Sequence, residues 1–148
     1  MLVGIKSGVF LSLHAGHIWC IQEAKKKCSH LIILNNDDEY ILKKKKVCPI
    51  KLKDRLYILS HIKGVDEVGY YSGPSEHSWI KNFKENRLHQ EFGQNAKLIV
   101  FHSDELKDLK KEEIPGYGFA DEIEFIDKIN RPESVSKIFK EIRESKYD

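Results

Sequence analysis

Short apolar runs alternate along this chain with segments whose apolar residues recur every three or four positions. The first pattern is typical of buried β-strands and the second of helices that cover one face of a sheet. The strand-like runs are residues 2–5, 30–34, 65–68, 96–101 and 122–126. The helix-like sets are Ile18, Ile21, Ala24 and Cys28, then Leu56, Leu59 and Ile62, then Trp79, Ile80 and Phe83, and finally Val135, Ile138, Phe139 and Ile142. This alternation predicts an α/β fold, a Rossmann-like doubly wound parallel sheet of about five strands flanked by helices.

The connections that follow the strands are the segments in which to look for chemistry, because such sheets bind ligands beyond the carboxyl ends of their strands. A basic loop is expected at the lysine run 43–46, before a helix that begins near Asp54. Residues 72–94 are harder to place. Ser72-Gly73-Pro74-Ser75 predicts a loop, and the polar residues after the Trp79 helix fit an ordered lid and a dimer contact equally well.

Composition narrows the class of protein. The length of 148 residues suits one domain, 1–148, with a substantial core. The formal net charge of +2 gives no overall basic field, so we expect no nucleic-acid partner. The sequence has no apolar run of about 18 residues and no signal-peptide pattern, so we expect a cytoplasmic protein without a membrane partner. Cys20, Cys28 and Cys48 lack CxxC spacing and indicate free thiols.

The most specific stretch is 8–17, which reads GVFLSLHAGH and follows the first predicted strand. The helical spacing that starts at Ile18 places His14 and His17 at the beginning of a helix. Unpaired backbone N–H groups and the helix dipole favour an anion there, and two imidazoles add donors for a phosphoryl group. Gly16 has no Cβ, so a nucleotide can approach the backbone between the histidines.

This stretch resembles the signature of the cytidylyltransferase-like nucleotidyltransferases, G-x-F-D-x-x-H-x-G-H. The residues at signature positions are Gly8, Phe10, His14, Gly16 and His17. Leu11 replaces the signature Asp, and Val9 replaces a frequent Thr. The resemblance implies a catalytic role for both histidines and nucleotide contacts for Gly8, Val9, Phe10, His14, Gly16 and His17.

The resemblance continues into the basic segment and the helix after it. Lys44 and Lys46 stand where glycerol-3-phosphate cytidylyltransferases carry two lysines for the triphosphate and the acceptor phosphate. It therefore implies substrate binding by Lys44, and nucleotide binding and catalysis by Lys46. Arg55 lies in a stretch similar to the family's E-x-R, which implies a substrate contact.

Two later segments complete the resemblance. Asp104 falls in the family's Gly-x-Asp, with His102 in place of the glycine, and is implied to bind nucleotide. Ser134 and Ser136 keep hydroxyls at two positions of the family's I-S-T-T-x-I, at the start of the last predicted helix. The resemblance implies that they hold the β/γ end of the triphosphate.

Members of this family transfer a nucleotidyl group: a phosphate oxygen of the acceptor attacks the α-phosphate of a nucleoside triphosphate, and pyrophosphate leaves. They include glycerol-3-phosphate and sugar-phosphate cytidylyltransferases and sugar-phosphate, pantetheine-phosphate and FMN adenylyltransferases. The resemblance implies CTP or ATP as donor, a phosphorylated polyol or sugar as acceptor, and a homodimer; the lysine match favours CTP. Mg²⁺ is expected between the phosphates, with few or no protein ligands because it keeps much of its water.

Two other interpretations stay open. A nucleotide-binding homologue with weak or no catalysis is favoured by Leu11, Val9 and His102. A protein without a nucleotide, such as a zinc-binding or assembly module, would use the histidine pair differently, with Cys20 as a third zinc ligand. The remaining candidates also have ordinary structural readings, since lysine runs are often solvated, Ser is a preferred helix cap and Asp is a common turn residue.

Overall fold

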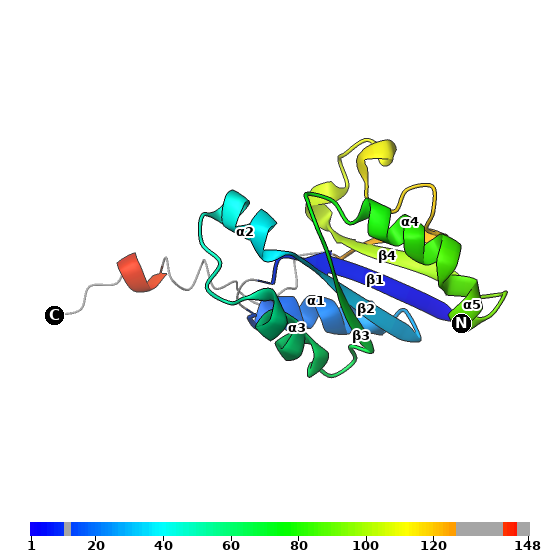
Figure 1. Cartoon of the computed structure of the whole chain (residues 1–148), viewed down its shortest axis with the longest axis horizontal. Coiled ribbons are helices and arrows are strands. Elements are labelled where there is room, and N and C mark those ends of the chain that lie inside the picture. The colour runs from blue at the N-terminus through cyan, green and yellow to red at the C-terminus, as the bar shows by residue number, and fades with distance from the viewer. Residues whose placement is uncertain (11–12, 127–140, 145–148) are drawn as a thin grey trace.

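The structure, a computed structural model, describes residues 1–10, 13–126 and 141–144. Its centre is a five-stranded parallel sheet with the strand order β3-β2-β1-β4-β5 (Figure 1). The strands are β1 (Leu2–Gly8), β2 (His30–Asn36), β3 (Glu67–Tyr71), β4 (Lys97–Ser103) and β5 (Glu122–Ile126). The predicted strands are all present, and the predicted doubly wound α/β fold is confirmed.

Helices cover both faces of the sheet (Figure 1). Helices α1 (Ala15–Lys25) and α3 (Leu52–Ser60) lie on one face, and α4 (His77–Asn86) and α5 (Leu88–Phe92) on the other. Successive residues of β2 pack into different cores, as the alternation of side chains along a strand requires. Ile33 joins the core that contains Ile21 of α1, whereas Ile32 joins the core that contains Phe83 of α4.

The strand order reverses between β1 and β4. From β1 the chain winds outward through β2 to β3, and it then returns to the other side of β1 to form β4 and β5. The connections after β1 and β4 leave the sheet toward opposite faces and open a crevice between them. The segment that follows β1 carries His14, and the short 3₁₀ helix η1 (Asp104–Leu106) follows β4.

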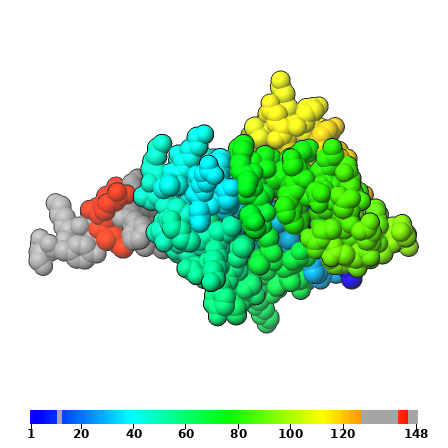
Figure 2. All heavy atoms as spheres, viewed as in Figure 1, coloured from blue at the N-terminus to red at the C-terminus, as the bar shows by residue number. Residues whose placement is uncertain are grey.

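The lysine run lies mostly in a helix, α2 (Asp38–Lys45), so the expectation of a basic loop was wrong. Asp37 caps this helix by accepting a hydrogen bond from the amide of Tyr40, at 2.9 Å. Acidic residues occupy its first turn and lysines its last turn, as the helix dipole favours. Helix α2, cyan in Figures 1 and 2, lies beyond the carboxyl end of β2, and its Tyr40, Lys44 and Lys45 line a pocket at this end of the sheet.

Two aspartates hold the opposite end of the sheet. The Asp66 carboxylate, one residue before β3, accepts a hydrogen bond from the Leu31 amide at 2.8 Å and pairs with Lys25 at 2.6 Å. The Asp121 carboxylate, one residue before β5, accepts from the Leu98 amide at 2.7 Å and pairs with Lys84. Each carboxylate thus fixes how its strand starts against the neighbouring one.

Leu11, Ser134 and Ser136 lie outside the described residues, as does most of the last predicted helix. Residues 141–144 are helical, which agrees with the end of that prediction. Across the described ranges, none of the helices has the length and apolar character needed to cross a membrane.

Candidate active site

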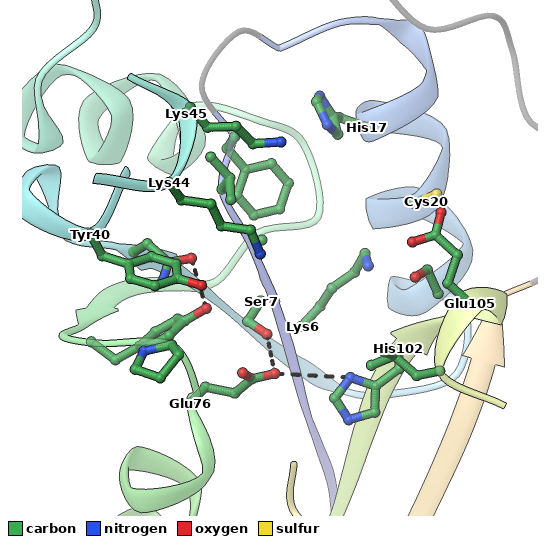
Figure 3. Close-up of a pocket in the computed structure, with 18 of the residues that line it drawn as sticks. Lys6, Ser7, His17, Cys20, Tyr40, Lys44, Lys45, Glu76, His102 and Glu105 are labelled. Atoms are coloured by element: carbon green, nitrogen blue, oxygen red, sulfur yellow. Dashed lines mark hydrogen bonds and ion pairs between the residues drawn. The ribbon is translucent and has the colours of Figure 1, made fainter. Parts of the chain in front are cut away.

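A pocket of about 620 Å³ opens at the carboxyl ends of β1 and β4, where the strand order reverses (Figure 3). Its walls come from the end of β1, the start of α1, the last turn of α2, the residues before α4 and the segment after β4. This is the position that the fold predicts for a ligand. Cationic, imidazole and carboxylate side chains all face it.

The two histidines of the signature lie together at the start of α1. His14 caps the helix, since its Nδ1 accepts a hydrogen bond from the Gly16 amide at 3.0 Å. An accepting Nδ1 places the proton of a neutral imidazole on Nε2, so His14 can donate to a ligand. The His17 ring stacks on the His14 ring with centroids 3.9 Å apart, and both residues line the pocket. The predicted position of both histidines at the start of this helix is confirmed, and their phosphate contacts stay predictions.

The end of β1 forms the floor beside the histidines. Gly8, Val9 and Phe10 line the pocket, and the Phe10 ring meets the His17 ring edge-on at 5.4 Å. A Cβ at Gly8 would lie 2.9 Å from the Phe10 ring, so any larger residue here would have to displace that ring. Gly16 is buried and its amide is used by His14. The nucleotide contacts predicted for these residues stay predictions.

The lysines that line the pocket are not the pair, Lys44 and Lys46, that the resemblance to the family implied. Lys44 and Lys45 line the pocket, and the Lys44 ammonium lies 5.7 Å from the centre of the Tyr40 ring. Lys46 ends α2 in the left-handed conformation with φ 68° and is exposed, and it is not one of the residues that line the pocket. Lys45 rather than Lys46 therefore lies with Lys44 at this pocket, and the phosphate contacts predicted for Lys44 and Lys46 stay predictions.

Arg55 has a structural role that the sequence did not suggest. Its side chain is 1% exposed and points into the protein from α3. The guanidinium donates to a ring of protein acceptors: the backbone oxygens of Ile50, Val9 and Asn36 and the side chains of Asn35 and Asp38. These contacts join α2, α3, β2 and the residue after β1. The predicted contact between Arg55 and substrate is not supported by this geometry.

Asp104 is the first residue of η1, and its Oδ1 lies 4.0 Å from the Lys107 ammonium. Its neighbours Ser103, Glu105 and Leu106 line the pocket, whereas Asp104 is not one of the lining residues. Its predicted nucleotide contact stays a prediction.

Sequence reasoning missed a buried polar cluster on the pocket floor. Ser7 donates a hydrogen bond to Glu76 Oε1 at 2.6 Å, and His102 Nδ1 lies 3.9 Å from the same oxygen (Figure 3). Lys6, Glu76 and His102 are each less than 10% exposed. The signals available in the sequence were a lysine inside an apolar strand and a histidine where relatives carry glycine. The contact between Ser7 and Glu76 spans 69 residues and has no local signature.

Protonation in this cluster follows from burial. Burial lowers the pKa of His102, because the charged imidazolium loses its water. Burial also raises the pKa of Tyr71, so its phenol keeps its proton and donates to Asn36 Oδ1 at 2.9 Å. His102 Nε2 lies 2.8 Å from the Pro115 carbonyl oxygen, which can only accept, so the Nε2 atom carries the proton.

The zinc-binding alternative from the sequence places a metal ion on the histidine pair and Cys20. Cys20 lines the same pocket, but within the described part of the chain no three His, Cys, Asp or Glu side chains are grouped so that they could hold a metal ion. Among the described residues that line the pocket, Glu76 and Glu105 carry carboxylates, and that of Glu76 accepts a hydrogen bond from Ser7.

Comparison with known proteins gives a consistent picture. The model of the cytidylyltransferase-like family matches residues 5–138. Over 147 residues the chain is 29% identical to an FAD synthase of Methanothermobacter marburgensis, covering 96% of this chain and 86% of that protein. It is 35% identical over 68 residues to the bifunctional protein HldE of Granulibacter bethesdensis, of which it spans only 14%. A solved structure of a lipopolysaccharide core biosynthesis protein from Thermoplasma volcanium shares the fold, with a TM-score of 0.63, 22% identity and coverage of 90% and 99% of the two chains.

Proposed function

This chain belongs to the cytidylyltransferase-like family of nucleotidyltransferases, and on that premise we propose that it transfers the adenylyl group of ATP to a small phosphorylated acceptor. A phosphate oxygen of the acceptor attacks the α-phosphorus of ATP, and the bond from that phosphorus to the bridging oxygen of the β-phosphate breaks. The products are an adenylylated acceptor, in which two phosphates are joined, and pyrophosphate. A single domain, working as a homodimer, is part of the proposal.

The observation that carries the proposal is the stacked pair of His14 and His17 at the start of α1, on the wall of a pocket that also holds Lys44 and Lys45. Such a site supplies hydrogen-bond donors and cations, which suits direct in-line transfer between bound phosphates. The His14 Nε2–H donates to an oxygen of the α-phosphate as negative charge develops there. The lysines offset the charge of the triphosphate and of the acceptor phosphate as the two approach.

The choice of ATP over CTP rests on the relatives. The chain aligns with an FAD synthase over almost its whole length, and formation of FAD from FMN is an adenylyl transfer. The lysine match that favoured CTP is weaker, because Lys46 lies away from the pocket lining. FMN and sugar phosphates are therefore the first acceptors to test, with glycerol 3-phosphate as the polyol phosphate.

Magnesium fits this donor set as an ion carried by the phosphates. The described lining of the pocket includes the carboxylate of Glu105 and three lysines, Lys6, Lys44 and Lys45. A magnesium ion there would keep water and phosphate oxygens as most of its ligands. When bound, Mg²⁺ supplies charge neutralisation of the triphosphate. Glu105 is the residue that would hold it or its water.

A second function is favoured by one observation, the apolar Leu11 in the signature. A homologue that binds the nucleotide with little or no turnover would retain the phosphate contacts of His14 and Lys44. Such a protein would be stabilised by ATP without consuming it.

The test is pyrophosphate release by the purified chain with Mg²⁺ and either ATP or CTP. Each nucleotide is combined with FMN, glucose 1-phosphate and glycerol 3-phosphate, and thermal shifts are recorded for the nucleotides alone. We expect release with ATP and one acceptor. Release with CTP alone would refute the choice of ATP, and thermal stabilisation by ATP without any release would favour the binding homologue.

A further inference from the structure

Glu76 and His102 present two hydrogen-bond acceptors to the pocket, side by side. The Pro115 carbonyl holds the proton of His102 on Nε2, so the Nδ1 of a neutral imidazole carries a lone pair. That lone pair lies 3.9 Å from Glu76 Oε1, which is itself an acceptor. The separation is longer than a hydrogen bond, and two acceptors do not attract one another. The pair is therefore complementary to a group that brings protons.

The protein hydroxyls nearby do not fill this need. The Ser7 hydroxyl donates to Glu76 Oε1 and has no second proton to give. The Tyr71 hydroxyl donates to Asn36. Glu76 immediately precedes α4, where an acidic side chain often caps the helix, yet it makes no such cap and lies toward Ser7 instead. Helix capping thus does not explain the orientation of this carboxylate.

Burial of Glu76 and His102 lowers the stability of the protein unless a ligand or solvent supplies the hydrogen bonds that these two side chains lack. The Glu76 side chain is 9% exposed and that of His102 is 4% exposed. A buried carboxylate with few donors is destabilising, and a phosphate placed against it would be repelled. At the other side of the same pocket Lys44 and Lys45 provide the charge that a phosphate requires. The pocket therefore has cations at Lys44 and Lys45 and two groups that accept protons at Glu76 and His102. Lys6, the third lysine of the lining, is buried in the same cluster as these two acceptors.

We propose that Glu76 and His102 form a subsite that binds a hydroxyl group of the acceptor, while Lys44 and Lys45 hold its phosphate. The acceptor is then a polyhydroxylated phosphate, such as a sugar phosphate or a compound with a polyol chain, rather than a phosphate on a purely apolar body. The hydroxyl donates its proton to Glu76 Oε1 and remains next to His102 Nδ1. This subsite rests on the proposed function, because it selects the acceptor of that reaction.

A metal ion is a poorer occupant of this subsite. One carboxylate and one imidazole are fewer than the three or four protein ligands of a zinc site. A site built to bond a hydroxyl, in contrast, needs few groups and discriminates strongly against an analogue that lacks the hydroxyl.

The experiment compares each acceptor with its hydroxyl-deficient analogue. The pairs are glucose 1-phosphate and 2-deoxyglucose 1-phosphate, glycerol 3-phosphate and propyl phosphate, and FMN and a flavin whose ribityl chain is replaced by a phosphorylated pentyl chain. The measured quantity is the ratio of kcat/KM for the two members of the active pair, obtained from pyrophosphate release. We expect the wild type to prefer the hydroxylated member at least about tenfold.

Three variants test whether Glu76 causes the preference for the hydroxylated acceptor. Glu76→Met removes the acceptor and should bring the ratio toward one, and Glu76→Gln should give an intermediate ratio because a neutral acceptor binds a hydroxyl less strongly than a carboxylate. The matched control is Ser7→Ala, which removes the internal hydrogen bond of Glu76 but leaves the carboxylate, and it should keep the wild-type ratio. If the Glu76 variants do not fold, as judged by melting temperature, His102→Phe takes their place and should also lower the ratio.

The outcomes separate the two levels of the proposal. A wild type that does not discriminate, or a Glu76 variant that loses activity equally on both members so that the ratio is unchanged, refutes the hydroxyl subsite and leaves the transferase function standing. Absence of pyrophosphate release by the wild type with every acceptor refutes the transferase function, and the subsite falls with it.

Discussion

The Arg55 guanidinium extends from α3 to the Asp38 carboxylate in the first turn of α2, with Nη2 2.6 Å from Oδ1. The same Asp38 oxygen accepts a hydrogen bond from the Leu52 amide at the start of α3. Burial raises the pKa of Asp38, but the hydrogen bonds from Arg55, Cys48 and Leu52 outweigh it and hold that pKa below its usual range. This pair fixes the helix that carries the lysines to the helix behind it.

Replacement of Arg55 therefore acts on stability. Arg55→Ala leaves several buried acceptors without a donor, and we expect the free energy of unfolding to fall by about 3–5 kcal/mol. Urea unfolding measures this loss. Lys53→Ala, on the exposed side of the same helix, is the control and should change stability by less than about 0.5 kcal/mol. Wild-type stability with lost turnover in Arg55→Ala would instead restore the substrate contact predicted from sequence.

The histidine pair should act on chemistry. His17→Ala and His14→Asn should each lower the rate of nucleotidyl transfer by about 10²–10³, since each removes a donor to developing charge. Asn is chosen at 14 because it is a good helix cap and replaces the bond from His14 to the Gly16 amide. Pyrophosphate release gives the rate, and circular dichroism checks the fold. His61→Ala, at the exposed end of α3, should behave as wild type; near wild-type turnover of His17→Ala would contradict the assigned phosphate contact.

Lysine variants distinguish the assignment based on the family's spacing, Lys44 and Lys46, from the assignment based on the pocket lining, Lys44 and Lys45. Lys44→Ala and Lys45→Ala should raise KM for ATP or acceptor about tenfold, equivalent to about 1.4 kcal/mol of binding. Lys43→Ala and Lys46→Ala should change it little, because these residues do not line the pocket of the histidines. Steady-state kinetics at constant ionic strength makes the comparison. A tenfold effect on KM at Lys46 with none at Lys45 would favour the assignment based on the family's spacing. Equal effects at all four lysines would indicate general electrostatic attraction without specific contacts.

We expect the rate of turnover to depend on Leu11, which stands where the signature has Asp. Restoring the family's carboxylate with Leu11→Asp should raise turnover about tenfold, for roughly 1.4 kcal/mol of transition-state stabilisation, with little change in nucleotide affinity. Turnover, affinity and melting temperature are measured together on both proteins. A wild type that is already fast and gains nothing would show that this position does not limit the reaction, and a loss of stability by a few kcal/mol would show that the site accepts only an apolar side chain.

Much of the fold followed from local pattern, and much of the site did not. Apolar runs located the strands because both faces of a parallel sheet are buried. The sequence did not predict α2 because four consecutive lysines, Lys43 to Lys46, are typical of a solvated loop. The Asp37 cap and the change from acidic to basic residues along the helix are the signals that favour a helix there. Arg55 and Glu76 could not have been assigned: their partners lie up to 46 and 69 residues away, and contacts of that kind depend on tertiary packing.

Acid should weaken the protein through the two aspartates that precede β3 and β5. Burial raises the pKa of Asp66 and of Asp121, but their hydrogen bonds to lysine and backbone N–H groups outweigh it, so both pKa values lie below the ordinary value. A lowered folded-state pKa contributes stability above the unfolded value, about 4, and this stability is lost as pH falls through the folded value.

Unfolding free energies from pH 7 to pH 3 should therefore decline below about pH 4. Asp66→Asn and Asp121→Asn should each lose about 1 kcal/mol at pH 7, a figure reduced because both carboxylates are partly exposed, and should show a flatter acid profile. The exposed Asp54→Asn is the control. If the variant that carries both Asp66→Asn and Asp121→Asn declines as steeply with acid as the wild type, other groups cause the acid sensitivity.

The same two aspartates have a consequence for how this scaffold can change. Slippage of a strand by one residue would exchange its inward and outward side chains, and each carboxylate holds its strand against that slippage at the end farthest from the pocket. The connections at the opposite end, which carry the lysines, Glu76 and η1, can then be lengthened or rewritten without disturbing strand alignment. Acceptor preference in this architecture is thus open to redesign by loop exchange, while the anchoring ends are left intact.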